Sequence, residues 1–267
     1  MHEFAGKSDP GNREGENEDA IGWDEEHQLW LVADGMGGHA AGNVASRIAT
    51  EKLLAADSAR PLEDRIVDAH EAIVTAADED ASRAGMGTTI VVARVDGDDA
   101  EIAWVGDSRA YLWRRGQLEQ LTRDHSYLEL LRAQNILTEE QIRADPRRNL
   151  VIQTLGLGEP KPSVHELPLR YGDWILLCSD GLNDEVEDDE LAAILARQST
   201  VQGAVDELVQ AALENGGRDI TSVVIVEFRG ARRLALYWRL LDSKWLPLII
   251  GATLAALVAI LLFAWAR

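Results

Sequence analysis

One cysteine, Cys178, stands alone in this sequence of 267 residues, so no internal disulfide bond can form. A chain without disulfides fits a reducing compartment best. The thiol ends an apolar run, 174–178, which is typical of a small side chain packed in a core. Residues 1–4 lack the basic and then apolar stretch that opens a signal peptide, so we expect no export signal.

Positive charge is also scarce, because 26 Lys and Arg face 46 Asp and Glu, for a formal charge of −20. Proteins that bind a nucleic-acid backbone need clustered Lys and Arg, so this balance argues against nucleic acid as a partner. Excess carboxylate keeps a domain soluble and supplies ligands for hard cations. Hydrophobic residues make up 46% of the chain, which is ample for a core.

Short runs of β-branched and aromatic residues, bounded by Gly or Asp, predict strands. The strand-like regions are 20–33 and 86–113, which include the runs 29–33, 88–93, 101–105 and 110–113, and two further runs are 174–178 and 222–228. Asp96-Gly97-Asp98 and Arg115-Gly116-Gln117 have the composition of hairpin turns. Ala-rich stretches with apolar residues three and four apart predict helices over 40–56, 61–83, 188–197 and 201–214. Strands and helices come in runs rather than in alternation, which favours an α+β fold of antiparallel sheets with helices on their outer faces.

The C-terminal part differs from the rest of the chain. Residues 229–244 are locally basic, and no charge occurs from Leu246 to Ala264. About twenty helical residues span about 30 Å, the thickness of a hydrocarbon core, and Trp245 and Trp265 flank the run as an aromatic belt would. A buried core helix is the weaker alternative. The sequence therefore predicts a domain over 1–228, a basic juxtamembrane linker over 229–244 and a transmembrane helix over 245–265, with the domain in the cytoplasm because the basic flank precedes the span.

Four aspartates share one local design, in which glycine lies beside or close to the Asp and an apolar strand precedes three of them: Asp34, Asp107, Asp180 and Asp219. Glycine lets the backbone approach closely, and carboxylates at the ends of buried strands are costly unless they are paired or bound to metal. The sequence has no cluster of Cys and His. Together these features predict a site made of oxygen ligands, which select Mg²⁺, Mn²⁺ or Ca²⁺ over zinc.

Eight motifs occur in a fixed order, namely NEDA, DGMGGH, AGNVAS, MGTT, GDSRAY, DHS, SDGL and GGRD. In this order the sequence resembles the metal-dependent serine/threonine protein phosphatases of type 2C, in their bacterial form, from about Ser8 to Phe228. The resemblance implies a four-layer α-β-β-α sandwich of two antiparallel sheets. It makes 1–228 the catalytic domain and implies an active site at one edge between the sheets, with at least two Mn²⁺ or Mg²⁺ ions.

The resemblance also implies the metal ligands, which are Asp19, Asp34, Gly35, Asp107, Asp180 and Asp219. Asp34 would bridge two ions, and Asp180 and Asp219 would hold the first of them. The carbonyl of Gly35 would complete the second site, Asp107 would help to form a third, and Asp19 would bind through water. A hydroxide that bridges two ions would then attack phosphorus directly, so no reactive cysteine is needed.

Two positions depart from the family pattern. The Arg that usually binds the substrate phosphate falls at Glu14 in this chain, and Arg13 lies one residue earlier. We expect Arg13 to face the site in its place, because a Glu there would repel phosphate. An Asn that commonly follows the last metal-binding Asp is Ile220 here, which puts the grip on the first metal in question.

Histidine 39 lies within DGMGGH, and the resemblance makes His39 a candidate to protonate the leaving oxygen. A structural hydrogen bond is the expected role of His125. Thr138 and Gln141 have the spacing of a capping box. The segment 145–155 corresponds to a mobile flap that we expect to influence substrate choice. The nearby Arg143, Arg147 and Arg148 either attract phosphate or are simply solvated.

The sequence therefore predicts metal-dependent hydrolysis of phosphoserine and phosphothreonine in proteins, by an enzyme anchored in the cytoplasmic (inner) membrane by a single helix. Phosphorylated proteins would be its partners, among them a Ser/Thr kinase that it opposes at the membrane. Two alternatives stay open. One is a membrane-anchored pseudophosphatase that binds phosphoproteins without turnover, which the two departures favour. The other is a metal-dependent hydrolase of small phosphate esters.

Overall fold

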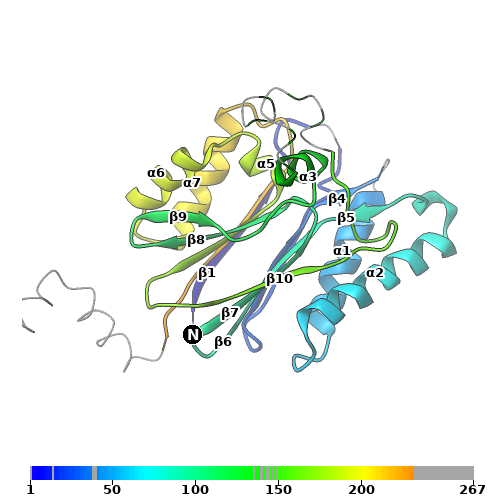
Figure 1. The fold of residues 1–267 in the computed structure, drawn as a ribbon, viewed down its shortest axis with the longest axis horizontal. Helices are drawn as coiled ribbons and strands as arrows, with labels where there is room; N and C mark the ends of the chain where they lie inside the picture. Colours follow the sequence, from blue (N-terminus) through cyan, green and yellow to red (C-terminus); the bar gives the residue numbers. More distant parts are fainter. Residues whose placement is uncertain are drawn as a thin grey trace, which may run out of the picture.

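The computed structural model describes residues 2–13, 15–37, 41–134, 136, 138, 141, 145, 147 and 150–230. Two five-stranded sheets pack against each other, and helices cover their outer faces (Figure 1). The first sheet has the order β1 (Glu3–Asp9), β12 (Thr221–Glu227), β11 (Trp174–Cys178), β8 (Arg109–Arg114) and β9 (Gln117–Gln120). The second has the order β10 (Ser163–Pro168), β7 (Asp99–Val105), β6 (Ile90–Asp96), β3 (Leu29–Ala33) and β2 (Ala20–Asp24). All pairings in both sheets are antiparallel, as predicted.

The helices lie where the apolar periodicity predicts them. The second sheet is covered by α1 (Ala41–Ala55) and α2 (Leu62–Glu79), and the first by α6 (Asp188–Arg197) and α7 (Val201–Glu214). Shorter elements are η1 (Ala81–Arg83), α3 (Tyr127–Ala133), α5 (Asp180–Asn183) and the two-stranded ribbon of β4 (Gly35–Met36) and β5 (Gly87–Thr88). The α+β sandwich with outer helices is therefore confirmed.

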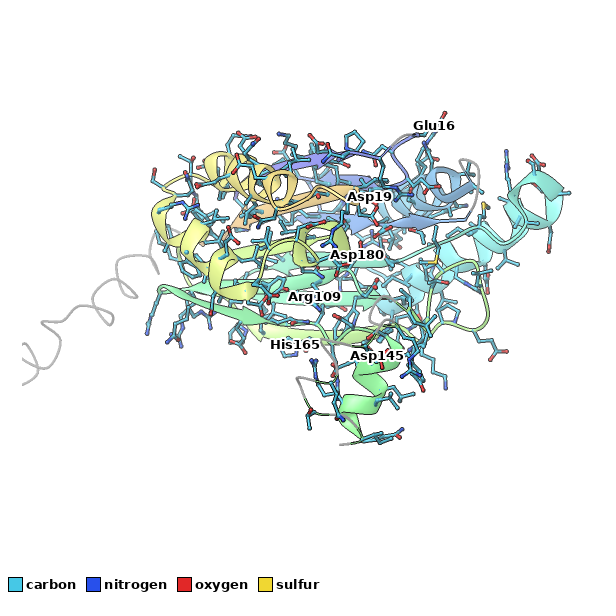
Figure 2. The ribbon with its side chains drawn as sticks, turned by 90° about the horizontal axis from the view of Figure 1, so that it is seen from above. Glu16, Asp19, Arg109, Asp145, His165 and Asp180 are labelled. Atoms are coloured by element: carbon cyan, nitrogen blue, oxygen red, sulfur yellow. The ribbon has the colours of Figure 1, made fainter. Side chains whose placement is uncertain are left out.

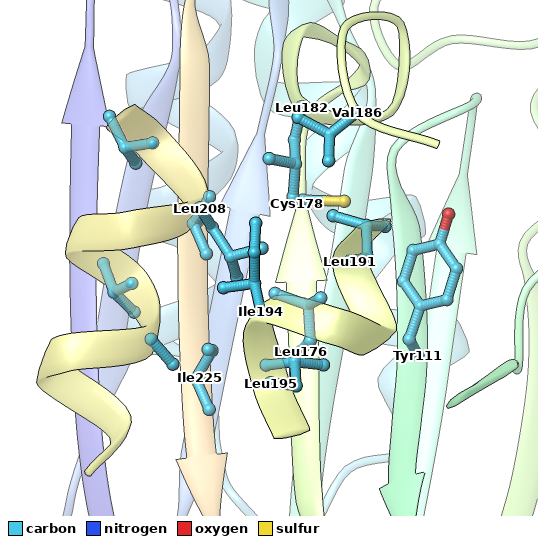
Figure 3. Packing of buried hydrophobic residues seen from close by; sticks show 14 of the residues in the cluster. Tyr111, Leu176, Cys178, Leu182, Val186, Leu191, Ile194, Leu195, Leu208 and Ile225 are labelled. Atoms are coloured by element: carbon cyan, nitrogen blue, oxygen red, sulfur yellow. The ribbon is translucent and has the colours of Figure 1, made fainter. Parts of the chain in front are cut away.

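Three apolar clusters hold the layers together. In β12, Val223 and Ile225 pack under α6 and α7, whereas Val224 and Val226 face the other sheet. Figure 3 shows the first of these interfaces, with Leu208 of α7 above the sheet. A strand that is buried on both faces reads as a continuous apolar run. This is why the central strands were the easiest to predict.

Cysteine 178 lies in the cluster under α6 and α7, as predicted for a core residue (Figure 3). Burial raises the pKa of its thiol to about 12. The thiolate is the nucleophilic form of cysteine, and it is not populated near neutral pH at such a pKa.

Both predicted hairpin turns are confirmed. The β8–β9 turn has positive φ at Arg115 (54°) and Gly116 (81°), as a type I′ turn requires, and the β6–β7 turn has positive φ at Gly97 (61°). Thr138 and Gln141 make the reciprocal bonds of a capping box, since each backbone N–H donates to the other side chain, at 2.9 and 3.3 Å. Hairpin turns and helix caps depend on a few neighbouring residues, so the sequence was sufficient to predict them.

The apolar pattern of the sequence does not predict three strands of the sandwich: β1, β9 and β10. Each of them lies at the edge of a sheet and is mostly half-buried or exposed. An edge strand needs no continuous apolar run, so its pattern is weak. Two predicted elements are also interrupted. Residue Thr89 separates β5 from β6 within the predicted strand 88–93, and α2 ends at Glu79, before a turn in which Asp80 caps Ser82.

The predicted linker 229–244 lies outside the described residues except for Arg229 and Gly230, and the predicted transmembrane helix 245–265 lies wholly outside them. Within the described ranges, no helix is long and apolar enough to cross a membrane.

The contact between α7 and the first sheet generates a stability prediction. Leu208 is fully buried, so Leu208→Ala should lower the free energy of unfolding by about 2–5 kcal/mol through lost burial and a residual cavity. The exposed Gln210→Ala on the same helix should change it by less than about 0.5 kcal/mol. Urea unfolding followed by tryptophan fluorescence measures both, and equal effects would contradict the packing described.

Candidate metal centre

Five aspartates meet at one end of the sandwich because of antiparallel pairing. Asp34, Asp107 and Asp180 follow the carboxyl ends of β3, β7 and β11, whereas Asp19 and Asp219 precede the amino ends of β2 and β12. Neighbouring antiparallel strands present opposite ends at the same edge, so all five positions converge. Ala20 pairs with Ala33, and Cys178 pairs with Val223, which fixes two of these approaches.

The converging side chains come from both sheets. Figure 2 shows Asp19 and Asp180 close together at this end, and the charge of Asp180 raises the pKa of Asp19. A cavity of about 500 Å³ opens here. Its charged lining consists of Arg13, Glu18, Asp34, Asp107, Asp180 and Asp219. Four of the predicted metal-ligating aspartates therefore line one cavity, together with Gly35 and the predicted phosphate-binding Arg13.

The backbone around Asp34 is held by two threonines of the MGTT motif. The Asp34 carbonyl oxygen accepts from the Thr88 hydroxyl (2.9 Å) and from the Thr89 N–H (2.8 Å), and the Asp34 N–H donates to Thr89 Oγ1 (3.2 Å). A Cβ atom at Gly35 would lie 2.2 Å from the Gly42 carbonyl oxygen, so only glycine fits there. Tight backbone packing thus fixes Asp34, for which the family resemblance implies a bridge between two metals.

Loss of water dominates the electrostatics of the cluster. Burial first, and then repulsion by neighbouring carboxylates, raises the pKa of Asp107 to about 8 and of Asp180 to about 6. Burial raises the pKa of Asp19 to about 7, although the hydroxyls of Ser222 and Ser179 oppose the rise. Burial first, and then repulsion by the neighbouring carboxylates, raises the pKa of Asp34 well above its usual value. Close, dehydrated carboxylates of this kind are stabilised by a bound cation.

The donor set fits a hard divalent cation. The Oδ2 atom of Asp19 is buried without a hydrogen-bond partner, and the other candidate donors around it are also oxygens. Within the described ranges, no group of three or more His, Cys, Asp or Glu side chains is arranged so that it could hold a metal ion without water. Mg²⁺ retains several waters and binds through few carboxylates, so an open, oxygen-lined cavity suits it better than a closed cage.

Histidine 125 has the structural role expected of it. Its Nδ1 accepts from the Gly106 N–H at 3.2 Å, its Nε2 lies 3.0 Å from Ser163 Oγ, and its ring stacks on Trp104. Burial lowers its pKa, which favours the neutral ring that these contacts need. His39 and Glu14 lie outside the described residues.

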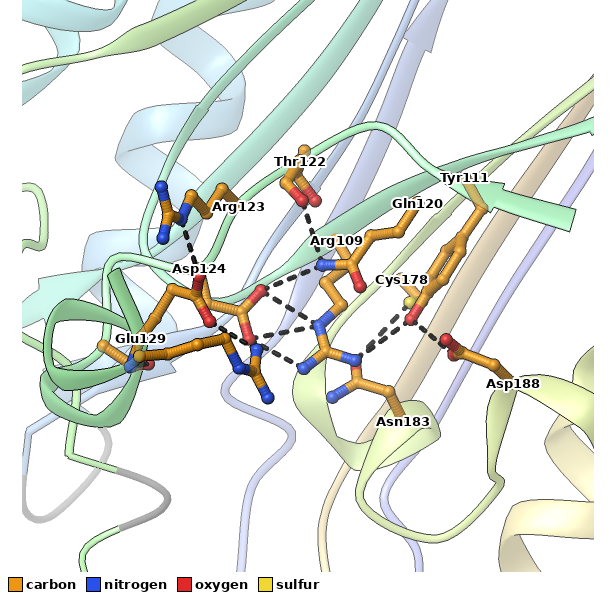
Figure 4. Close-up of polar contacts among 12 residues, drawn as sticks. Arg109, Tyr111, Gln120, Thr122, Arg123, Asp124, Glu129, Cys178, Asn183 and Asp188 are labelled. Carbon is orange, nitrogen blue, oxygen red and sulfur yellow. Dashed lines mark hydrogen bonds and ion pairs between the residues drawn. The ribbon is translucent and has the colours of Figure 1, made fainter. Parts of the chain in front are cut away.

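Arg109 forms a polar network next to Asp107 that the sequence did not predict. Arg109 binds both oxygens of Asp124, through Nε at 2.9 Å and Nη2 at 2.7 Å (Figure 4). Its Nη1 donates to the Tyr111 hydroxyl at 3.1 Å, and that hydroxyl lies 3.3 Å from Asp188. These contacts tie β8 to the segment before α3 and to the start of α6. The only signal for them was the presence of Arg109 and Asp124 in two of the ordered motifs.

The segment after α3 approaches the cavity through Val151. Leu155 exchanges two backbone hydrogen bonds with Thr88, and the Gly156 N–H donates to His70 Nδ1 at 3.0 Å. Arg147 is paired with Asp145 at 2.6 Å and lies over the Tyr127 ring. These contacts account for Arg147 without a phosphate, whereas Arg143 and Arg148 lie outside the described residues.

Comparison with known proteins agrees with this geometry. Residues 12–215 match the family described as Protein phosphatase 2C. The serine/threonine phosphatase stp of Listeria monocytogenes is 38% identical over 210 residues, covering 74% of this chain and 83% of that protein. The serine/threonine protein phosphatase PstP of Mycobacterium tuberculosis is 33% identical over 231 residues, or 84% of this chain, and the match spans only 44% of that longer protein.

A solved structure is similar over the same region. It is the catalytic domain of PstP in complex with two manganese ions, with a TM-score of 0.77 and 32% identity over 85% of this chain and 97% of that one. The two-sheet sandwich with outer helices is therefore the fold of that catalytic domain. The chain belongs to the protein phosphatase 2C family.

The raised carboxyl pKa values generate a pH prediction for protein kept in chelator. The folded-state pKa values of Asp19 and Asp107 lie above the unfolded value, so the folded protein binds more protons between about pH 4 and pH 8. Their contribution to stability is present at low pH and is lost as the pH rises through the folded pKa. The melting temperature should therefore fall from pH 5 to pH 8.

Replacing one carboxylate should reduce that fall. Asp107→Asn should raise the melting temperature at pH 8 by roughly 3 °C or more, since about 1 kcal/mol corresponds to about 2–4 °C in a domain of this size. Added Mn²⁺ should raise the melting temperature of the wild-type protein at pH 8 again. Parallel curves for the two proteins in chelator, measured by differential scanning fluorimetry, would contradict the electrostatic account.

Proposed function

We propose that this chain hydrolyses phosphoserine and phosphothreonine in proteins, with two divalent cations, Mn²⁺ or Mg²⁺, held at the aspartate cluster. The observation that carries the proposal is that Asp34, Asp107 and Asp180, whose pKa values are raised by burial, line one open cavity. Membership of the protein phosphatase 2C family supports the same reaction class.

Each residue has a proposed task. Asp34 would bridge the two cations, with Asp180 and Asp219 on the first and the Gly35 carbonyl on the second. Asp107 would contribute to a third site, and Asp19, which does not line the cavity, would act through water. When bound, the cations supply an activated water and neutralise the phosphoryl oxygens.

The charge of the cavity indicates an order of binding. A phosphate dianion that approaches the five carboxylates of the lining is repelled unless cations have neutralised them. The chain's own positive group on the lining is Arg13, for which we keep a role near the phosphate, and His39 stays the proposed general acid. Cys178 is fully buried, so a cysteine nucleophile is excluded for this reaction.

We also propose that residues 245–265 anchor the domain in the cytoplasmic membrane, where it would oppose a Ser/Thr kinase. Strand β12 leads away from Asp219 at the cavity to Gly230, so seven strand residues separate the two by roughly 23 Å. The chain therefore leaves the described domain at the end of β12 that is remote from the cavity. Sharing a membrane with a kinase and its substrates would raise their local concentration.

One assay tests the reaction. The chain should release phosphate from a phosphothreonine peptide with Mn²⁺ and none in chelator. Asp34→Asn should lower kcat/KM by at least about 100-fold, because it removes a ligand of both ions. Asp206→Asn, on the exposed face of α7, should leave kcat/KM unchanged. Mn²⁺ binding without turnover would identify a pseudophosphatase, and turnover of p-nitrophenyl phosphate alone would identify a small-ester hydrolase.

Membrane anchoring has a separate test. The full chain expressed in bacteria should pellet with the inner membrane and require detergent for release, because 245–265 is apolar throughout. A chain that ends at Gly230 should stay in the supernatant and retain phosphatase activity. Recovery of the full chain in the supernatant would reject the anchor and leave the catalytic proposal intact.

A further inference from the structure

Asp219 is less buried than Asp107, which lines the same cavity. Its side chain is 46% exposed, whereas Asp107 is buried. A half-exposed carboxylate can rotate unless neighbours hold it. Two donors do so here, because Asp219 Oδ1 accepts from Arg13 Nη1 at 2.5 Å and from the Ile220 N–H at 2.8 Å. Both bonds fall on Oδ1, so they orient the carboxylate without using Oδ2.

The guanidinium of Arg13 also contacts a second acid on the cavity. Its Nη2 lies 3.7 Å from Glu18 Oε2, and only 18% of the Glu18 side chain is exposed. The Glu18 carbonyl oxygen accepts from the Ser46 hydroxyl at 2.6 Å, which ties this residue to α1. Arg13 therefore spans two acids that are about 200 residues apart in the sequence.

The loop that carries Arg13 is itself fastened to the loop that carries Asp219. The Asn12 N–H donates to the Gly217 carbonyl oxygen at 2.8 Å, and Asn12 Nδ2 donates to the Gly216 carbonyl oxygen at 2.9 Å. A Cβ atom at Gly11 would lie 2.6 Å from the Asp219 carbonyl oxygen, so the two backbones are in close contact. The backbone that carries Arg13 is therefore held in place next to Asp219.

We propose that Arg13 is a positioning residue that orients Asp219 and so presents Oδ2 to the first divalent cation. The inference rests on the proposed function, which makes Asp219 a metal ligand. Carboxylates that bind metals are commonly held by hydrogen bonds from outer neighbours, and loss of such a neighbour typically costs about 10–100-fold in metal affinity. The planar fork of Arg suits a contact with two acids, and the ammonium group of Lys does not reproduce it.

Two other roles for Arg13 give different results. If Arg13 only repels the cation, its loss tightens metal binding, because opposition between like charges is removed. If Arg13 only binds phosphate, its loss raises KM for a phosphopeptide and leaves metal affinity unchanged. Arg13→Lys separates positioning from charge, because it keeps the positive charge and removes the fork.

The test is titration of the full chain with Mn²⁺ by isothermal calorimetry, for wild type, Arg13→Lys and Arg13→Ala. Arg218→Lys is the matched control. Arg218 precedes Asp219 in the sequence, and its guanidinium donates two hydrogen bonds to Glu185 rather than to Asp219. Arg13→Lys should raise the Mn²⁺ Kd by at least about threefold. Arg218→Lys should leave the Kd unchanged. Melting temperatures in chelator show whether each variant is folded.

Kinetics complete the experiment, with Mn²⁺ varied to find the concentration for half-maximal activity and held at saturation to find KM for the peptide. After Arg13→Lys, the Mn²⁺ concentration for half-maximal activity should rise in step with the Kd, and KM for the peptide should change less. An unchanged or lower Mn²⁺ Kd in folded Arg13→Lys overturns the positioning role. Failure of the proposed function looks different, since wild type would then bind no Mn²⁺ or release no phosphate.

Discussion

The rest of the site depends on the burial of several carboxylates at one end of the sandwich. Asp19 and Asp107 lose water there, and their pKa values rise to about 7 and 8. Such a cluster is costly unless cations neutralise it, so metal binding and the stability of this end are thermodynamically linked. The three apolar clusters that join the four layers offset this cost elsewhere in the domain.

Rigid strand ends make this arrangement possible. The carboxylates stand at the ends of strands from both sheets, and the backbone of Asp34 is fixed by Thr88 and Thr89. Gly35 has no room for a side chain. Positions held in this way lose little freedom when a cation or a phosphoryl group binds, which is the benefit of a preorganised site.

Arginine has a consistent use in this acidic protein. Arg109 forms a salt bridge with Asp124 near Asp107, and Arg13 forms one with Asp219. In both places a guanidinium fixes a carboxylate near the cavity. Positive charge for the substrate would therefore come chiefly from the bound cations. This division agrees with a formal charge of −20 and with a substrate that is a phosphate dianion.

The family resemblance carried by the order of the acidic motifs implied the sandwich, whereas the central strands, the outer helices and the hairpin turns could be predicted from the residue pattern alone. These features are local or periodic, as in the apolar β11, which is buried on both faces. The edge strands and the partners of Arg13 could not be predicted, because they depend on contacts between distant parts of the chain. The contact of Arg13 with Asp219 joins residues 206 positions apart. Raised pKa values likewise need burial and proximity, which exist only after the sheets have brought distant strand ends together.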